Sequence, residues 1–264
     1  MSILDEIVAH KRTELAASPE EEITIASLKA KVVARGGVRD FTAALANPRA
    51  GDVGLIAEVK KASPSAGIIR ADFDPVKIAQ EYESAGASCL SVLTDEKYFQ
   101  GSLAYLKAIR AEVKLPLLRK DFVIDERQIA EAIDWGADAV LLIAAILDDA
   151  KLARFYELAT GAGLSAMVEV HDLVELQRAQ AINAPLIGVN NRNLKDFTVD
   201  LGTTESLAEQ MDLQQTLLVA ESGIDSRADV KRLTACGARA VLVGESLMRE
   251  DNISAKVRAL GGWS

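Results

Sequence analysis

Trp135-Gly136-Ala137-Asp138-Ala139-Val140-Leu141-Leu142-Ile143 joins the end of a helical pattern to a continuous apolar run. Glycine at this junction suits a helix that must stop and turn back. An apolar run without alternation is typical of a strand that is covered on both faces. The same junction recurs in Ala85-Gly86-Ala87, Gly161-Ala162-Gly163 and Cys236-Gly237-Ala238. Beyond residue 50 the chain is therefore a repeat of strand, loop and helix.

Eight apolar runs follow residue 50, and helical patterns separate them. They cover residues 54–60, 88–93, 116–120, 138–144, 165–170, 185–190, 216–221 and 239–244. Strands joined through helices pair in parallel by right-handed crossovers. In a chain of 264 residues, eight such units predict an α/β fold that is a single (β/α)8 TIM barrel. A doubly wound open sheet is the alternative.

Residues 1–50 lie outside the repeat and predict an N-terminal helical extension. A first helical pattern follows Ser2 as a cap, a second runs through Leu28, Val32 and Val33, and a third short one covers Phe41 to Ala46. These pieces are too small to bury a core of their own. We expect them to pack on the barrel, residues 51–264, as part of one domain, either below it or over its mouth.

The charge balance limits the partners that the chain can have. The net charge is −9, from 39 acidic and 30 basic residues, whereas nucleic acid requires a clustered basic face. No apolar run reaches the roughly 18 residues of a membrane span, and the N-terminus does not have the pattern of a secretion signal. We therefore expect a cytoplasmic monomer with a small-molecule substrate, no nucleic-acid partner and no membrane contact.

Charged residues occur at the carboxyl ends of the predicted strands, where TIM barrels carry their reactive groups. Strand alternation turns Glu58 and Lys60 the same way as Ile56, into the interior, where an unpaired charge is costly. The ends of later strands bear Lys120, Glu169, Asn190 and Glu221. Lysines and glutamates enclosed together can hold opposite protonation roles. These residues predict an acid–base site, with a structural ring of ion pairs as the alternative.

Two glycine loops predict a phosphate site. Ser222-Gly223 follows the seventh predicted strand and Gly244-Glu245 follows the eighth, and these two loops of a TIM barrel commonly bind phosphate through backbone N–H groups. Ser63 and Arg192 are further candidate donors. Alternatively, the glycines only form turns.

Other residue types carry a weaker signal. Phe99 and Phe122 fall in predicted loops at the charged mouth, where they either stack on an aromatic substrate or only close the loops over the core. Cys89 and Cys236 have no metal-ligand spacing, so we expect buried free thiols and no metal. His171 comes just after a strand, which suits a helix start or a surface position better than catalysis.

At these residues the sequence closely resembles the indole-3-glycerol-phosphate synthase family, and the resemblance covers nearly the whole chain. The matching segments are Glu58-Val59-Lys60-Lys61-Ala62-Ser63-Pro64-Ser65, Asp72-Phe73-Asp74-Pro75, Leu93-Thr94-Asp95 with Tyr98-Phe99-Gln100-Gly101-Ser102, Leu118-Arg119-Lys120-Asp121-Phe122, Val168-Glu169-Val170-His171, Gly188-Val189-Asn190-Asn191-Arg192-Asn193-Leu194 and Glu221-Ser222-Gly223-Ile224. The resemblance implies a TIM barrel with a helical N-terminal extension. It also implies that 1-(2-carboxyphenylamino)-1-deoxyribulose 5-phosphate is cyclised to indole-3-glycerol phosphate, with loss of carbon dioxide and water and without a cofactor.

The resemblance further implies a role for each candidate residue. Lys120 would be the general acid of ring closure, and Glu169 would be the base of dehydration. Lys60 would pair with the substrate carboxylate and is also a candidate acid for dehydration, so the division of the acid roles between the two lysines stays open. Glu58, Asn190 and Glu221 would hold the lysines and the substrate hydroxyls. The phosphate region would comprise Ser63, Arg192, Ser222, Gly223, Gly244 and Glu245, the last through its backbone N–H alone. The anthranilate pocket would comprise Pro64, Phe99, Phe122 and Leu194.

Three other functions compete with this interpretation. A phosphosugar isomerase barrel would require a Cys and Asp pair at strand ends, and neither cysteine ends a predicted strand. A Schiff-base aldolase would use Lys60 or Lys120 as an amine nucleophile. A catalytically idle barrel would only bind a phosphorylated ligand or a protein partner.

Overall fold

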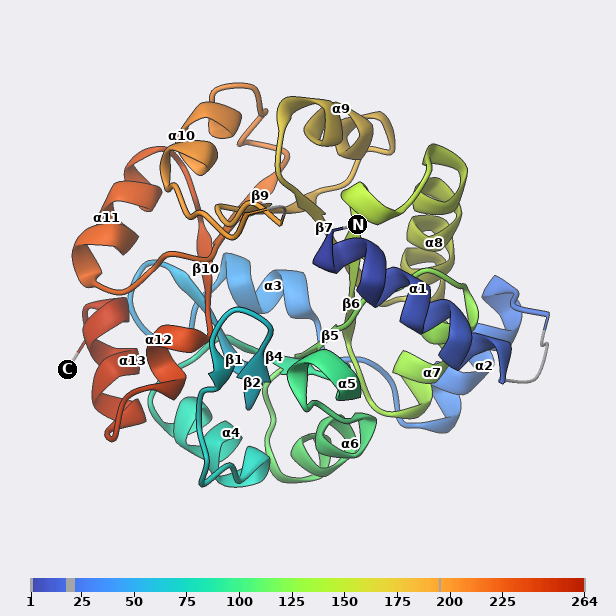
Figure 1. The fold of residues 1–264 in the computed structure, drawn as a ribbon, viewed down its shortest axis with the longest axis horizontal. Coiled ribbons are helices and arrows are strands. Elements are labelled where there is room, and N and C mark those ends of the chain that lie inside the picture. Colours follow the sequence, from blue (N-terminus) through green and yellow to red (C-terminus); the bar gives the residue numbers. More distant parts are fainter. Residues whose placement is uncertain (1, 18–21, 195, 264) are drawn as a thin grey trace.

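The computed structural model describes residues 2–17, 22–194 and 196–263, and their strands close into a barrel surrounded by helices (Figure 1). The parallel strands follow the order β1-β10-β9-β8-β7-β6-β5-β4, and β1 also pairs with β4. Closure excludes the open sheet. The barrel strands are β1 (Gly54–Val59), β4 (Cys89–Leu93), β5 (Leu117–Lys120), β6 (Ala139–Ile143), β7 (Ser165–Val170), β8 (Leu186–Asn190), β9 (Leu217–Glu221) and β10 (Ala240–Val243). Each prediction is confirmed to within one residue at either end.

The helices form the outer layer. They are α4 (Pro75–Ser84), α6 (Leu103–Glu112), α7 (Arg127–Asp134), α8 (Asp149–Ala162), α9 (Leu173–Ala181), α10 (Gly202–Ala208), α11 (Arg227–Ala235) and α13 (Ile253–Gly261). Local chemistry sets where they begin: Asp74 caps α4 by accepting hydrogen bonds from the N–H groups of Val76 and Lys77, with Pro75 in the first turn. Short elements lie in the loops above the barrel: β2 (Ala62–Ser63), β3 (Gly67–Ile68), α5 (Glu96–Phe99), the 3-10 helix η1 (Ala144–Ile146) and α12 (Glu245–Met248).

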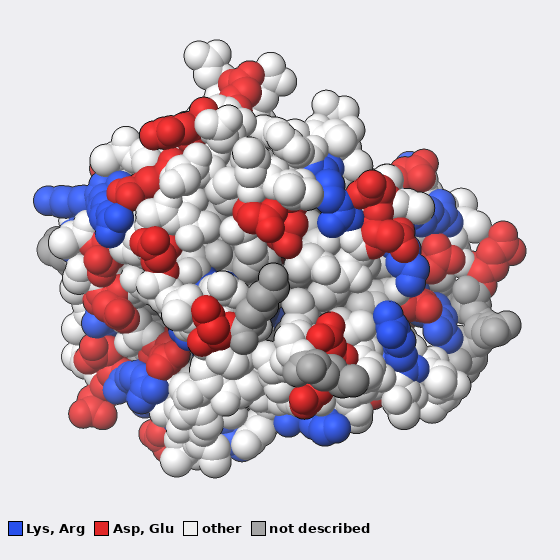
Figure 2. Space-filling view, turned by 45° about the horizontal axis from the view of Figure 1, so that its top comes forward, with Lys and Arg blue, Asp and Glu red and all other residues white. Residues whose placement is uncertain are grey.

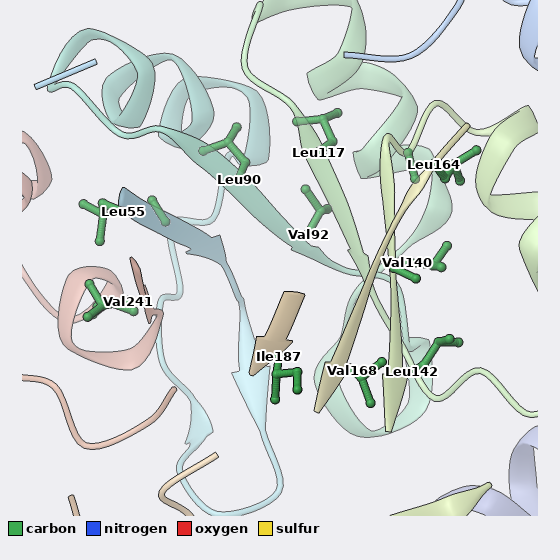
Figure 3. Packing of buried hydrophobic residues seen from close by; sticks show 14 of the residues in the cluster. Leu55, Leu90, Val92, Leu117, Val140, Leu142, Leu164, Val168, Ile187 and Val241 are labelled. Atoms are coloured by element: carbon green, nitrogen blue, oxygen red, sulfur yellow. The ribbon is translucent and has the colours of Figure 1, made fainter. Parts of the chain in front are cut away.

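Strand alternation divides the core into two layers. In β4, Leu90 and Val92 pack outward in the large cluster between sheet and helices, which Figure 3 shows at close range. Cys89 belongs instead to the inner cluster, together with Ile56 of β1 and Leu118 of β5. Because side chains two residues apart share a face, Glu58 and Lys120 continue the inner rows that Ile56 and Leu118 begin.

The N-terminal extension lies at both ends of the barrel. From the sequence we expected it at one end only, either below the barrel or over its mouth. It consists of α1 (Ile3–Ala16), α2 (Ile25–Ala34) and α3 (Phe41–Ala46). Phe41 of α3 is fully buried in the inner cluster, and its carbonyl accepts a hydrogen bond from Sγ of Cys89, the first residue of β4. Figure 1 draws α3 behind the strands and α1 in front of them. The extension thus closes the amino end with α3 and covers the carboxyl end with α1.

A buried lysine holds α1 to the barrel. Nζ of Lys11 lies 3.1 Å from a carboxylate oxygen of Asp95 and 3.1 Å from one of Asp121, and 2.9 Å from Glu14 of its own helix. Burial lowers the pKa of Lys11, but these carboxylates outweigh burial and raise it. Asp121 directly follows Lys120, so this contact ties α1 to the segment that bears the predicted acid.

The surface agrees with the charge balance of the sequence. In Figure 2 acidic side chains are spread over the displayed face, with basic side chains interspersed among them. Within the described ranges, no helix combines the length and apolar character that a membrane crossing requires.

Phe41→Ala should destabilise the barrel, because it empties the fully buried plug at the amino end. We expect a loss of about 3–5 kcal/mol in the free energy of unfolding, measured by chemical denaturation. Val33→Ala in neighbouring α2, where the side chain is 78% exposed, is the control and should change it by less than about 0.5 kcal/mol. Equal effects of the two variants would contradict the assignment of Phe41 as the plug.

Candidate active site

A cavity of about 630 Å³ opens at the carboxyl end of the barrel. All of the residues that the sequence analysis selected for the site line it: Glu58, Lys60, Ser63, Pro64, Phe99, Phe122, Lys120, Glu169, Asn190, Arg192, Leu194, Glu221, Ser222, Gly223, Gly244 and Glu245. They come from different strand ends and from the loops that follow them, so the closure of the barrel is what brings them together.

Lys120 lies at the centre of the polar layer. Its Nζ is 3.1 Å from Oε2 of Glu169 and 3.6 Å from Oε2 of Glu221. Asn190 completes the group, because its Nδ2 donates to Oε1 of Glu169 at 3.2 Å. Residues from four strands thus meet around one ammonium group.

Lys60 forms a second ion pair at the same mouth. Its Nζ lies 2.9 Å from Oε1 of Glu58, and the hydroxyl of Ser91 donates to the other oxygen of Glu58 at 3.3 Å. Glu58 is 5% exposed and Lys60 is 16% exposed. The carboxylate therefore anchors the pair inside the barrel while the ammonium group reaches the cavity.

Two glycines leave the space that the buried carboxylates occupy. A Cβ at Gly188 would overlap Oε1 of Glu221, and a Cβ at Gly244 would overlap Oε1 of Glu58. Gly188 lies on β8, beside β9, which ends in Glu221, and pairs with Glu169 of β7. The small residues on these inner rows are thus a requirement of the charged ones.

Burial and neighbouring charges shift the pKa values of the two central carboxyl groups, Glu169 and Glu221, in opposite directions. Burial raises the pKa of Glu169, but Lys120 and His171 outweigh burial and lower it. Burial and the Glu169 carboxylate raise the pKa of Glu221. Burial lowers the pKa of Lys120, but the carboxylates of Glu169, Glu221 and Glu58 outweigh burial and raise it. Lys120 and Glu169 are therefore charged at neutral pH, and Glu221 is the carboxyl group that more readily holds a proton.

The loops after β8, β9 and β10 form a second, more open part of the cavity. Ser222 has a left-handed backbone with φ 66°, which is uncommon outside glycine, and Gly223 follows with φ 76°. The Ser222 hydroxyl donates to Oδ1 of Asn190 at 2.9 Å. The carboxylate of Glu245 lies 2.7 Å from Arg249 and 3.8 Å from Arg192. Glu245 therefore contributes a charge that orders two arginines, in addition to the backbone N–H that we expected of it.

The opposite wall is apolar. The rings of Phe99 and Phe122 are 6.0 Å apart, and Ile3, Leu4 and Ile7 of α1 line the cavity with them. The sequence left the place of α1 open between the mouth and the bottom of the barrel, and no residue of α1 was expected in the site. The apolar residues of its first turn showed that one face of α1 is buried. They did not show whether that face packs against the barrel or lines a substrate cavity.

Other expectations have mixed outcomes. Arg119 faces the helices and pairs with Glu131 of α7 at 2.7 Å. Cys89 is buried and Cys236 half-buried, and both are free thiols. Of the two positions expected for His171, the helix start agrees with the structure, because His171 directly precedes Asp172, the N-cap of α9. The surface position is wrong, because the ring is only 13% exposed and contacts Glu169. No group of three His, Cys, Asp or Glu side chains in the described part of the chain is arranged to hold a metal ion.

The fold and the cavity together define a TIM-barrel enzyme with acid–base groups at the carboxyl end of its strands. A sequence model of the family described as "Indole-3-glycerol phosphate synthase" matches residues 4–260. The chain belongs to this family.

Individual relatives agree with that assignment. The indole-3-glycerol phosphate synthase of Azospirillum brasilense is 56% identical over 210 residues, which is 80% of each chain. The proteins of the same name from Leptothrix cholodnii and Laribacter hongkongensis are 50% and 49% identical and cover 98% and 94% of both chains.

Solved structures of lower identity share the fold. A 3-hexulose-6-phosphate synthase superposes with a TM-score of 0.63 at 14% identity, over 79% of this chain and 98% of that one. A thiamine phosphate pyrophosphorylase from Pyrococcus furiosus reaches 0.59 at 16% identity, over 80% and 94% of the two chains. These likenesses support the TIM barrel and no particular activity.

Gly188→Ala should lower both stability and activity, because the new methyl group needs the space of the Glu221 carboxylate. Overpacking of this kind costs about 1–3 kcal/mol. Combining it with Glu221→Asp shortens the opposing side chain, so the double variant should be more stable than the two separate losses predict. Thermal and chemical unfolding of the four proteins provides the measurement. Simple additivity would show that the two residues do not compete for space.

Proposed function

We propose that this cavity converts 1-(2-carboxyphenylamino)-1-deoxyribulose 5-phosphate to indole-3-glycerol phosphate, with Lys120 as acid and Glu169 as base. Membership of the family makes the protein a carbon–carbon lyase of tryptophan biosynthesis. The observation that carries the assignment of roles is the 3.1 Å contact between Lys120 and Glu169 inside the cavity. A proton donor and a proton acceptor are thereby within reach of the same bound atom.

Substrate orientation follows from the two sides of the cavity. The phosphate would lie at the loops after β9 and β10, where Ser222, Gly223 and Gly244 offer backbone N–H groups and Arg192 a cation. The anthranilate ring would lie against Phe99 and Phe122, with Pro64 and Leu194 completing the wall. Its carboxylate would then meet Lys60, whose Nζ is already paired with Glu58. This pose puts the ribulose carbonyl near Lys120.

Ring closure requires a proton donor. The ring carbon attacks the carbonyl carbon, a carbon–carbon bond forms, and negative charge develops on the carbonyl oxygen. Lys120 supplies a proton to that oxygen, and loss of carbon dioxide restores the aromatic ring. A positioned acid contributes about 10²–10⁴-fold to such a step. Oε1 of Glu221 is buried without a hydrogen-bond partner among the described residues, which suits an acceptor for a substrate hydroxyl.

Dehydration requires a base, and ring closure makes Glu169 a stronger one. Once Lys120 has given up its proton, Glu169 loses one of the two cations that lower its pKa. The carboxylate then becomes a better acceptor for the proton of the carbon next to the one that bears the hydroxyl, while Lys60 donates a proton to that hydroxyl. The hydroxyl leaves as water and the carbon–carbon double bond of the indole forms. Asn190 donates a hydrogen bond to Glu169 that does not involve Lys120. The two steps of the reaction are thus linked through one ion pair.

The remaining features of the proposal concern the whole protein. We propose that it works without a metal or organic cofactor, as a cytoplasmic monomer in which residues 1–50 and 51–264 form one domain. The contacts of Phe41 with the inner cluster and of Lys11 with Asp95 and Asp121 support the single domain.

The activity itself is tested by incubating the purified protein with the carboxyphenylamino-deoxyribulose phosphate and following indole fluorescence. Fluorescence should rise with release of one carbon dioxide per product. Borohydride addition during turnover should leave both Lys60 and Lys120 unmodified, since the mechanism forms no Schiff base. Absence of the indole product, or a reduced adduct on either lysine, would contradict the proposal.

Lys120→Ala should lower kcat by about 10³-fold or more while KM changes little, because the lost group acts on the transition state. Steady-state fluorescence kinetics provides the measurement. Lys231→Ala removes an exposed lysine of α11 and serves as the control. Turnover near the wild-type rate in the Lys120 variant would remove Lys120 from the acid role.

Glu169→Gln should stop the reaction after ring closure. Substrate should then disappear, and carbon dioxide appear, faster than the indole product forms, which quenched single-turnover samples can resolve. The variant keeps the size of the side chain and loses its charge. Glu157→Gln, at an exposed position of α8, is the matched control. An unchanged rate of indole formation in the Glu169 variant would exclude it as the base.

A further inference from the structure

His171 lies directly behind the proposed base. Its Nε2 is 3.3 Å from Oε1 of Glu169, and its Nδ1 is 3.0 Å from Oε2 of Glu175. The imidazole ring, 13% exposed, thus bridges a carboxylate of the cavity and one of the helical layer. His171 itself is not among the cavity-lining residues, so its effect on a substrate must pass through Glu169.

The first turn of α9 fixes this ring. Asp172 caps the helix by accepting a hydrogen bond from the N–H of Glu175. The Glu175 carboxylate reaches back and accepts hydrogen bonds from both the backbone N–H of His171, at 2.8 Å, and its ring. The ring orientation therefore follows from the capping geometry of the helix.

The charges around the ring favour its doubly protonated form. Burial lowers the pKa of His171, but Glu169 and Glu175 outweigh burial and raise it to about 10. Two other titratable groups lie on the far side of Glu169. Lys120 pairs with that carboxylate, and the pKa of Glu221 is raised by burial and by Glu169, a shift that the charge of His171 opposes only weakly. At neutral pH the ring is therefore an imidazolium that carries a proton on each nitrogen.

Glu169 is consequently surrounded by donors. Oε2 of Glu169 accepts a hydrogen bond from Nζ of Lys120, and Oε1 accepts one from Nδ2 of Asn190. Nε2 of His171 also faces Oε1. Nε2 lies within ion-pair distance but is buried and not aligned for a hydrogen bond. When Lys120 turns to the substrate, His171 is the cation that stays beside Glu169.

We propose that His171 is a positioning residue for this reaction: Glu175 holds its cationic ring against Glu169, which keeps the orientation and the ionised state that the dehydration step needs. This inference rests on the proposed function. His171 touches no substrate atom and moves no proton to one. It acts on the base alone, which separates its effect from that of Lys120.

Kinetics of variants provides one test. His171→Leu should lower kcat by about 10- to 100-fold, the scale expected when a catalytic group is misplaced, with a much smaller change in KM. His171→Gln keeps an N–H donor that can bond to Glu175 but lacks the charge that faces Glu169, so it should recover only part of the loss. His10→Leu removes the other histidine of the chain, on α1, and should leave kcat within about twofold of wild type.

The charge of the ring is tested independently of activity. Since the chain has two histidines, the ring resonances of His171 can be assigned in NMR spectra by comparison with His10→Gln. The His171 ring should remain doubly protonated at pH 8, and Glu175→Gln should lower its pKa, because one of its two anionic partners is lost. This measurement does not depend on the folding of a His171 variant.

The outcomes separate the two proposals. A wild-type protein that makes no indole product would refute the proposed function, while the NMR titration would still report on the ring. A wild-type protein that is active, together with a His171→Leu variant of unchanged kcat, would refute only the role of His171. A neutral His171 ring at pH 8 would refute it as well. A wild-type kcat in His171→Gln would contradict the role of the ring's charge, and equal losses in His171→Gln and His171→Leu would contradict the role of the Glu175 contact.

Discussion

The ion pair between Lys120 and Glu169 is the interaction on which the rest of the site depends. A buried pair of this kind gains little net stability over apolar residues, and removing one partner strands the other charge. A barrel built only for stability would fill this layer as it fills the one below, with residues such as Leu118 and Met167. The surrounding structure makes the pair tolerable: Glu221, Asn190 and His171 each contact one of its members.

The alternation of strand side chains explains how one sheet supplies both core and chemistry. The rows that face inward are closed at the amino end by Phe41, continue through apolar residues and finish in charged groups at the carboxyl end. Glycine appears on these rows where a carboxylate needs room, as Gly188 does beside Glu221. Stability and reactivity are therefore segregated along the barrel axis, and α1 covers the reactive end.

Sequence patterns were sufficient for the strands and for the charged residues of the cavity, because both follow from regular alternation and from the rule that barrels react at strand ends. Pro64 and Leu194 of the apolar wall came only from the family resemblance. They were insufficient where a residue depends on a partner far away in the sequence. Lys11 reads as one more charge on an amphipathic helix until the fold brings Asp95 and Asp121 to it. Likewise, a histidine after a strand gave no sign that the next helix would turn Glu175 back onto it. The charge pairing of Glu245 with two arginines was missed for the same reason.

The most direct measurement is a crystal structure of the protein with an unreactive substrate analogue in which the ribulose carbonyl is reduced to a hydroxyl. The account predicts that Nζ of Lys120 lies within about 3 Å of that oxygen, as a proton donor must, with Glu169 still in contact with His171 and Asn190. A complex in which Lys60 approaches this oxygen and Lys120 stays bound between Glu169 and Glu221 would contradict it.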